Sequence, residues 1–308
     1  MQTIVLNILL ILLSVLALWW GAVWVVEAAA RIARRLGLSE LVIGLTIVAI
    51  GTSSPEFAVT VGAALRGQGD ISVGNVVGSN IFNLGFILGG VALVRALATS
   101  PTMVVRDGGV LIATTLLLNL FFLDLQIARW EGIVLILLLV AYIGFLIYRR
   151  EPVEEIPIGE FHWYEVPRLL GGLALVVGGG HFLVEGAVAL ARLAGVSEWA
   201  IGVTIVAAGT SAPEFATSLV AVLRGRHGIS AGNLIGSDIF NLLGVLGLAA
   251  TLRPMTVDPS VHSSLWVLTG MVILVVVFLM RTGWIISRWE GALLILINLV
   301  RWILDFRG

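Results

Sequence analysis

The chain has 308 residues, of which 59% are apolar and only 12% are charged, and its formal net charge is −1. Its mean hydropathy of +1.07 lies well outside the range of water-soluble domains, and we expect no nucleic-acid partner. The chain has no cysteine, which excludes disulfides and thiolate metal sites. These properties predict an integral membrane protein.

Apolar runs long enough to cross a hydrocarbon core, roughly 20 residues each, recur along the whole chain. They fall near 4–27, 41–64, 72–93, 103–123, 127–148, 167–191, 198–222, 229–251, 261–280 and 284–304. The runs are continuously apolar and about twice as long as the alternating strands of a membrane barrel, so we expect no barrel. The sequence therefore predicts an all-α integral membrane fold with ten transmembrane helices.

The second and third of these spans recur as the seventh and eighth. Residues 39–83 and 197–241 align at a constant offset of 158 without a gap, and 28 of the 45 paired positions are identical. A shorter repeat, 129–132 against 288–291, extends the duplication to the fifth helix. The expected organisation is a first five-helix repeat over 1–150, a short linker over 151–166 and a second five-helix repeat over 167–308, with the repeated motifs at 39–89 and 197–247.

Loop arginines predict the orientation of these helices. All 18 basic residues are arginine; 12 of them fall in the odd-numbered connections and six on the other side. Cytoplasmic loops carry the excess of positive charge, so we expect both termini outside and the linker in the cytoplasm. Because each repeat has an odd number of helices, the second repeat enters the membrane from the opposite face. The sequence thus predicts inverted repeats, typical of secondary transporters, in the plasma membrane of a prokaryote.

Each repeated motif places one carboxylate deep in an apolar span. Glu56 lies near the middle of 41–64, and Glu214 is its equivalent in 198–222. A charged side chain at the bilayer centre costs about 2.5–3.5 kcal/mol on insertion scales. Neither span contains an Arg, Lys or His that could neutralise the carboxylate, so an exchangeable cation is the expected partner. The alternative is a structural role, with both glutamates protonated and hydrogen-bonded to helix hydroxyls.

The neighbouring side chains supply only oxygen ligands. Hydroxyls three and four residues before each glutamate share its face of a continuous helix, and a proline directly before it predicts a kink that leaves carbonyls free for ions. In the next span, a serine and an asparagine four residues apart face the same way. These residues are Thr52, Ser53, Pro55, Ser79 and Asn83 in the first repeat and Thr210, Ser211, Pro213, Ser237 and Asn241 in the second. Such oxygen ligands favour Ca²⁺ and Na⁺ over zinc, copper or iron.

Other repeated or unusual residues receive structural interpretations. The spacings Gly74-xxx-Gly78 and Gly232-xxx-Gly236 predict close helix packing. Glu27 and Glu185 lie near helix ends, where we expect interfacial salt bridges or snorkelling; Arg31 and Arg192 are close by in the sequence. We expect His181, which has no equivalent in the first repeat, to contribute to packing.

These motifs make the chain resemble the sodium/calcium exchanger family, within the wider cation/calcium antiporter superfamily. The resemblance covers essentially the whole chain and implies a monomeric ten-helix antiporter with four ion subsites between helices 2, 3, 7 and 8. It implies that Glu56 and Glu214 bind Ca²⁺ and share the Na⁺ sites, and that Thr52 and Thr210 add oxygens to the calcium site. The two outer Na⁺ sites would be lined by Ser53, Ser79 and the carbonyl of Ala49, and by Ser211, Ser237 and the carbonyl of Ala207. Asn83 and Asn241 would complete the middle.

Two positions depart from the expected pattern. Some prokaryotic and potassium-dependent members of the family have an Asp where this chain has Asn241, so the resemblance favours potassium-independent exchange. Asp238 stands where the first repeat has Asn80. Because it lies one residue away from the face shared by Ser237 and Asn241, we expect it to support the ion ligands from behind or to contribute to helix packing rather than to bind an ion.

The predicted function is Na⁺/Ca²⁺ antiport by alternating access, in which the first and sixth helices slide across the bundle. It needs no cofactor; the partners are Ca²⁺, Na⁺ and the lipid bilayer. The alternatives are a H⁺/Ca²⁺ or other cation exchanger on the same fold and, less favoured, a passive cation channel. We do not expect an enzyme, because no His, Lys or paired Asp accompanies Ser53 or Ser211 as a catalytic base.

Overall fold

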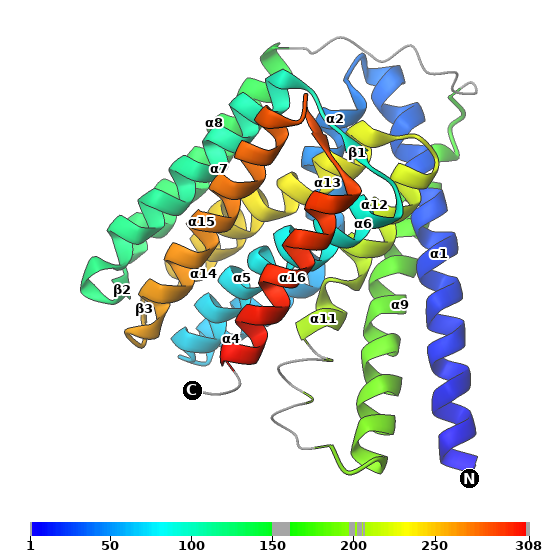
Figure 1. Ribbon diagram of the computed structural model, residues 1–308, viewed down its shortest axis with the longest axis horizontal. Helices are drawn as coiled ribbons and strands as arrows, with labels where there is room; N and C mark the ends of the chain where they lie inside the picture. Colours follow the sequence, from blue (N-terminus) through cyan, green and yellow to red (C-terminus); the bar gives the residue numbers. More distant parts are fainter. Residues whose placement is uncertain (1, 150–160, 197–200, 202–204, 206, 306–308) are drawn as a thin grey trace.

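The computed structural model describes residues 2–149, 161–196, 201, 205 and 207–305, and most of these residues are helical (Figure 1). The first half contains α1 (Gln2–Leu36), α2 (Glu40–Ile43), η1 (Gly44–Val48), α3 (Ala49–Thr52), α4 (Ser54–Leu65), α5 (Gly69–Phe82), η2 (Asn83–Ile87), α6 (Leu88–Val94), α7 (Pro101–Phe121), η3 (Phe122–Asp124) and α8 (Arg129–Arg149). The second half contains α9 (Glu165–Leu193), α11 (Ala207–Thr210), α12 (Ala212–Leu223), α13 (His227–Ile239), η5 (Phe240–Val245), α14 (Leu246–Leu252), α15 (Ser260–Arg281) and α16 (Arg288–Asp305). Four two-residue strands complete the list: β1 (Leu97–Ala98), β2 (Gln126–Ile127), β3 (Met255–Thr256) and β4 (Ile285–Ile286).

Helix α1 is longer than the apolar run that predicted it. The run ends near residue 27, whereas the helix continues to Leu36. Arg34 and Arg35 lie in its last turn, where positive charge stabilises the carbonyl end of a helix. Gly37 follows with φ of 66°, a left-handed conformation that ends the helix. Hydropathy thus located the membrane segment but not the polar turns beyond it.

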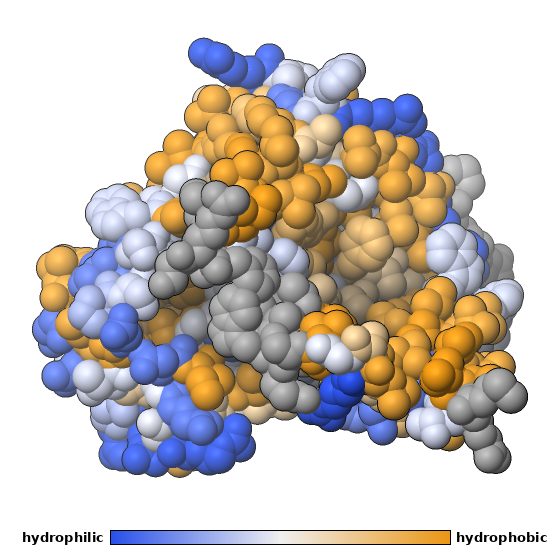
Figure 2. Space-filling model, turned by 60° about the horizontal axis from the view of Figure 1, so that its bottom comes forward, coloured by the Kyte–Doolittle hydropathy of each residue, from blue (hydrophilic) through white to orange (hydrophobic). Residues whose placement is uncertain are grey.

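Among the described residues, seven helices are long and apolar enough to cross a membrane, or eight if the bent pair 40–65 counts as one span. The apolar helix α12 is shorter, and much of the predicted span 198–222 before it lies outside the described residues. Hydrophobic side chains also cover much of the molecular surface, and hydrophilic ones gather mainly toward its edges (Figure 2). The protein is therefore an all-helical, multi-pass membrane protein.

Helices α1 and α9 run side by side as a pair at one flank of the bundle (Figure 1). They approach closely at Gly21, where an added Cβ would lie 2.8 Å from the carbonyl oxygen of Gly172. Side chains of this pair form one hydrophobic core with parts of α2, η1, α12 and α13, while a second, larger core joins α5–α8 to α13–α15. The pair thus packs against one side of the main body, through a core distinct from the larger one.

An ion-pair network joins the two helices of the pair at one end. Glu27 of α1 accepts from Arg168 of α9 at 2.5 Å and pairs with Arg224, and it lies 3.9 Å from Arg31. Arg31 in turn donates to Glu165 of α9 at 2.7 Å. The predicted salt bridge of Glu27 is therefore confirmed.

The short strands link the two halves of the chain by reciprocal contacts. Strand β1, after α6, pairs antiparallel with β4, and β2 pairs with β3, which follows α14. The chain segments after α6 and α14 are equivalent in the duplication, yet β1 and β3 lie at opposite ends of the molecule (Figure 1). Arg95 donates to the carbonyl of Leu223 at 3.0 Å, and its equivalent Arg253 donates to that of Leu65 at 2.8 Å. The two halves therefore contact each other in a symmetric way.

Candidate cation site

Each buried glutamate lies in the first turn of a helix that begins at a break. In the first repeat the helical pieces before and after Ser53 meet at 54°. In the second repeat α11 ends and α12 begins on either side of Ser211. Pro55 and Pro213 occupy the first turns of α4 and α12. Backbone N–H groups in a first turn have no acceptor within the helix, so the N–H that proline lacks costs no hydrogen bond there. The predicted proline breaks are therefore confirmed.

The break does not leave the predicted carbonyl open. The hydroxyl of Ser54 donates to the carbonyl of Gly51 at 2.7 Å, so this carbonyl, freed by Pro55, is already satisfied. The carbonyl of Ala49 accepts from the N–H of Ser53 at 3.0 Å and from the hydroxyl of Thr52 at 3.3 Å. Local side chains thus cap the broken end of α3.

Glu56 and Glu214 are held by serines of the opposite repeat. Glu56 is 1% exposed and Glu214 is fully buried. The hydroxyl of Ser53 donates to Oε1 of Glu214 at 2.9 Å, and the hydroxyl of Ser211 donates to Oε1 of Glu56 at 3.1 Å. The expectation that each serine faces the glutamate of its own helix is wrong, because the helix breaks at that serine and its side chain turns toward the other repeat. The two carboxylates thus belong to one site between the repeats.

Two asparagines fix the positions of the glutamate-bearing helices. Asn75 of α5 donates to the hydroxyl of Thr60 at 2.9 Å and to the backbone carbonyl of Glu56 at 3.3 Å. Asn233 of α13 makes the equivalent bonds to Ser218, at 2.9 Å, and to the carbonyl of Glu214, at 3.3 Å. Its oxygen also accepts from Thr52 of the first repeat at 3.0 Å. Sequence reasoning gave these asparagines no role, although their place in both motifs was a usable signal.

Several buried oxygens around this site have no hydrogen-bond donor. Each glutamate uses Oε1 for the opposite serine, whereas Oε2 has no partner among the described residues. Buried carboxylates of this kind are expensive unless a cation or a proton neutralises them. The same holds for oxygens of the next span, so the partnerless set comprises Glu56 Oε2, Glu214 Oε2, Asn83 Oδ1, Ser237 Oγ, Asp238 Oδ2 and Asn241 Oδ1. Such a surplus of acceptors fits an oxygen-coordinated cation.

Asn83 and Asn241 lie where their helices widen. Asn83 begins the π-helical segment η2, and Asn241 lies in the π-helical segment η5. Segments of this type are frequent at functional sites, because the wider turn redirects a side chain and frees backbone groups. Asn241 donates to Asn80 at 3.2 Å, and Asn83 donates to Asp238 at 3.0 Å. The structure therefore brings both asparagines into contact with the opposite repeat.

The remaining predicted site residues have less distinctive surroundings. The hydroxyl of Ser79 donates to the carbonyl of Val76 at 3.2 Å, within its own helix. Thr210 lines a cavity of 530 Å³ between α4, α9 and α11, which also borders Pro55 and His181. His181 contacts the ring of Phe182, but it is exposed and borders the cavity, so packing does not account for its whole environment. Ala207 begins α11, and the residue before it lies outside the described residues.

The repeated glycines behave differently in the two halves. An added Cβ on Gly232 would lie 2.6 Å from the carbonyl oxygen of Leu41, and one on Gly236 would lie 2.6 Å from the Cα of Leu45. The predicted close packing is therefore confirmed in the second repeat. At Gly74 and Gly78 no atom of a described residue lies within 4 Å of the added Cβ, so packing there is not observed.

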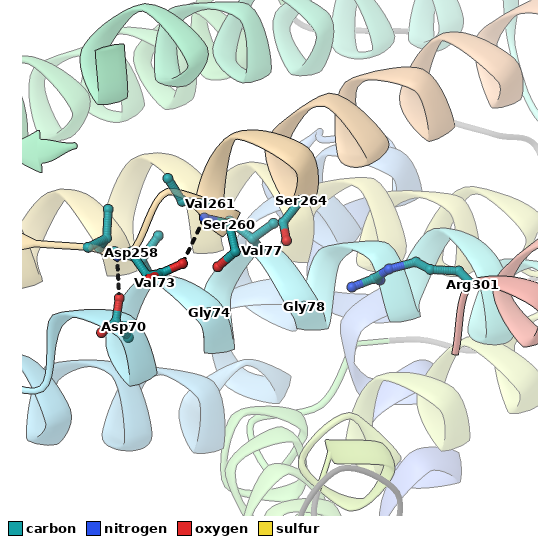
Figure 3. A pocket seen from close by; sticks show the side chains of 11 residues that line it. Asp70, Val73, Gly74, Val77, Gly78, Asp258, Ser260, Val261, Ser264 and Arg301 are labelled. Atoms are coloured by element: carbon teal, nitrogen blue, oxygen red, sulfur yellow. Dashed lines mark hydrogen bonds between the residues drawn. The ribbon is translucent and has the colours of Figure 1, made fainter. Parts of the chain in front are cut away.

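Gly74 and Gly78 instead line a cavity of 140 Å³ between α5, α15 and α16. Asp70, Asp258 and Ser260 lie at one end of this cavity, and Arg301 extends toward it from the other (Figure 3). Gly78 directly precedes Ser79, just as Pro55, in the wall of the larger cavity, precedes Glu56. Two cavities thus reach the immediate neighbours of the site residues.

Known proteins resemble this chain over nearly its whole length. The family described as sodium/calcium exchanger protein matches residues 6–148 and 166–301. The putative antiporter CaxA of Alkalimonas amylolytica is 37% identical over 300 residues, which cover 93% of this chain and 94% of that protein. The sodium/calcium exchanger MaX1 of Methanosarcina acetivorans is 33% identical, over 95% of this chain and 96% of that protein.

A solved structure of the sodium-calcium exchanger NCX_Mj, soaked with zero Na⁺ and Ca²⁺, has the same fold. It superposes with a TM-score of 0.85 at 29% identity and covers 96% of this chain and 98% of that chain. The family match, the two relatives and the fold agree over nearly the whole length. The chain belongs to the sodium/calcium exchanger family and is a membrane antiporter for cations including Ca²⁺.

Proposed function

We propose that the protein exchanges Na⁺ for Ca²⁺ by alternating access at a site built around Glu56 and Glu214. The observation that carries this proposal is the reciprocal arrangement of the two carboxylates. Each is buried, each accepts one bond from a serine of the opposite repeat, and each retains an oxygen without a donor. The names of MaX1 and NCX_Mj support the choice of Na⁺ as the coupling ion.

The charge of the site explains the coupling. Two ionised glutamates carry two negative charges, which one Ca²⁺ balances; Na⁺ ions that occupy the glutamate oxygens exclude it. The proposed ligands are Glu56, Glu214, Thr52, Thr210, Ser53, Ser211, Ser79, Ser237, Asn83, Asn241 and the carbonyls of Ala49 and Ala207. The bonds that already occupy the carbonyl of Ala49 would have to weaken when an ion binds there.

The proposed architecture is ten membrane spans in two inverted repeats, 1–150 and 167–308, joined by the linker 151–166. The reciprocal strand pairs support it, because equivalent strands β1 and β3 lie at opposite ends of the molecule. The first turn of α1 and the last turn of α16 lie toward the same end of the molecule, as ten spans require (Figure 1). We propose a monomer in a prokaryotic plasma membrane with both termini outside.

The moving part is proposed to be the pair α1–α9. Its helices contact each other extensively, and the hydrophobic core that they share with parts of α2, η1, α12 and α13 is distinct from the larger core of the main body. The main body is joined across the repeats by strand pairs, whereas the pair packs on it largely through side chains. A slide of the pair across the body would open the 530 Å³ cavity beside Pro55 and Thr210 to one side of the membrane and then to the other.

The test is uptake of radiolabelled Ca²⁺ into Na⁺-loaded proteoliposomes. Wild-type protein should accumulate Ca²⁺ against its gradient when Na⁺ flows out, and Glu56→Gln and Glu214→Gln should each abolish this uptake. Glu185→Gln is the matched control, because Glu185 is an exposed carboxylate of α9 that is not among the proposed ligands. Retained exchange in both site variants would remove the basis of the proposal.

The same vesicles distinguish other functions. Ca²⁺ uptake that follows a pH gradient and ignores a Na⁺ gradient would identify a proton-coupled exchanger. Ca²⁺ flux that only runs down its own gradient would identify a channel. Either result would replace the proposed function.

A further inference from the structure

Asp238 is a third buried carboxylate near the site. It lies in α13, is fully buried, and occupies the position that is Asn80 in the first repeat. Sequence reasoning gave it a supporting role behind the ligands or in helix packing, because it is one residue away from the face of Ser237 and Asn241. Asp238 does lie between packed helices, but only its Oδ1 atom accepts a hydrogen bond there, and its Oδ2 atom has no partner among the described residues.

Two asparagine amides contact Asp238, and they satisfy only part of it. The amide of Asn83 donates to Oδ1 of Asp238 at 3.0 Å, and the amide of Asn80 donates to its backbone carbonyl at 3.0 Å. The amide of Asn241 donates to the oxygen of Asn80 at 3.2 Å. Asn83 to Asp238 and Asn241 to Asn80 are therefore equivalent bonds in the two repeats. The one difference is that the acceptor is a carboxyl group in the second repeat and an amide in the first.

The cluster has more acceptors than donors. Its three side-chain amides are used in these bonds, whereas Oδ2 of Asp238 and the amide oxygens of Asn83 and Asn241 have no partner among the described residues. All three oxygens are buried: Asn83 is 2% exposed, and Asp238 and Asn241 are fully buried. Unpartnered buried acceptors around a carboxylate are the surroundings that a cation satisfies.

No basic side chain among the described residues would balance a charge on Asp238. No Arg, Lys or His among the described residues pairs with it, and Glu214 lies near enough to repel it. No three acidic or histidine side chains of the described residues converge on one point. Asp238 is therefore not a third ligand of an ion held by both glutamates. Its single charge matches a separate monovalent ion beside them.

We propose that Asp238, with the amide oxygens of Asn83 and Asn241, binds one Na⁺ that remains in place while the two glutamates hold Ca²⁺. This inference rests on the proposed exchange function and deepens it. The glutamate pair balances Ca²⁺, and the Na⁺ at Asp238 balances the third carboxylate, so the Ca²⁺-loaded protein is neutral at the site. Occlusion of Ca²⁺ without this Na⁺ would leave an unpaired charge inside the membrane.

The experiment measures exchange of Ca²⁺ for radiolabelled Ca²⁺ with equal Na⁺ on both sides of the vesicle and a large organic cation as the replacement ion. Low Na⁺ should accelerate the wild-type exchange at least about tenfold, because it neutralises a charge that is costly at membrane depth. Higher Na⁺ should inhibit, as it competes for the glutamates. In Asp238→Asn the exchange should be fast without Na⁺, and Na⁺ should only inhibit it.

The substitution is conservative in shape. An asparagine at 238 can still accept from Asn83, as Asn80 accepts from Asn241 in the first repeat. The double variant Asn80→Asp/Asp238→Asn moves the carboxylate to the equivalent position and should regain stimulation by Na⁺. Because it retains one carboxylate in the cluster, it also separates the effect of charge from an effect on folding.

Three results would overturn the assignment. They are an unchanged response to Na⁺ in Asp238→Asn, stimulation of the wild type by acid in place of Na⁺, and a double variant that exchanges Ca²⁺ without regaining the response. A wild-type protein without Na⁺-driven Ca²⁺ uptake would instead refute the proposed function. If wild-type uptake is Na⁺-driven and Asp238→Asn responds to Na⁺ like wild type, only the role of Asp238 fails.

Discussion

The two halves of the chain offer a matched pair of glycines that tests the packing around the site. Gly74 and Gly232 are equivalent in sequence, but their surroundings differ. A Cβ on Gly232 would lie 2.6 Å from the carbonyl oxygen of Leu41 and 2.9 Å from the backbone nitrogen of Leu45. A Cβ on Gly74 would have no described atom within 4 Å. Alanine should therefore be tolerated at one position and not at the other.

The expected loss of stability follows from the kind of atom that the added Cβ would contact. Both neighbours of a Cβ at 232 are backbone atoms, so α13 and the helix segment 41–45 must move apart. Overpacking of this kind typically costs about 1–3 kcal/mol. In proteins of about this size each kcal/mol shifts the melting temperature by about 2 °C, so Gly232→Ala should melt about 2–6 °C below wild type. Gly74→Ala should melt within about 1 °C of wild type, as expected for a substitution that meets no neighbour.

The assay is thermal unfolding of the purified protein in detergent, followed by tryptophan fluorescence or by size-exclusion chromatography after heating. Wild type and both alanine variants are compared in the same buffer without Ca²⁺. Equal melting temperatures for the two variants would refute the reasoning, because they would mean that Gly74 and Gly232 are packed equally closely in the purified protein. A larger loss in Gly74→Ala would refute it more strongly.

Three further predictions concern the frame around the site. Asn233→Ala should lower the melting temperature more than Asn75→Ala, because Asn233 also accepts from the first repeat; thermal unfolding of both variants measures the difference, and equal losses would contradict it. Arg224→Gln removes a contact between the main body and Glu27 of α1, so it should alter the rate of Ca²⁺ exchange with little loss of stability; an unchanged rate would argue against a moving α1–α9 pair. Hydrogen bonds from the backbone and side chain of Ser260 lower the pKa of Asp258 below its usual 3.8. The ionised carboxylate therefore stabilises the fold above pH 3.8, and this stabilisation is lost as the pH falls through the lowered pKa. Asp258→Asn should therefore melt below wild type at pH 7 but not at acid pH, and an equal difference at both pH values would contradict this account.

The sequence predicted the class of fold and the ligand chemistry better than it predicted the contacts. Long apolar runs located most helices, and the duplication identified the equivalent glutamates, because both signals are local or repeated in the chain. The pairing of Ser53 with Glu214 was not predictable in this way. It depends on the helix ending at Ser53 and on the distance between the two repeats, and neither follows from spacing along one helix.

Other differences have the same physical origin. Hydropathy does not distinguish an α-helix from a π-helical segment, so the widening at Asn83 was invisible in the sequence. Small residues at Gly232 and Gly74 have the same pattern, but packing needs a partner, and only the structure shows where one is present. The geometry of a single helix gave Asp238 a supporting role behind the ligands or in helix packing. Its contacts come from Asn80 and Asn83 of the other repeat.

The reciprocal strand pairs have a consequence for the energetics of transport. They join the loops of the two halves through backbone hydrogen bonds, β1 to β4 at one end and β2 to β3 at the other. A movement between the halves of the main body would have to break those bonds at both ends at once. A movement of the α1–α9 pair exchanges mainly side-chain contacts, which can be replaced by similar contacts as the pair advances. If the α1–α9 pair moves as proposed, we expect the strands to direct thermal motion into that one component and to keep the glutamates at a constant separation during each cycle.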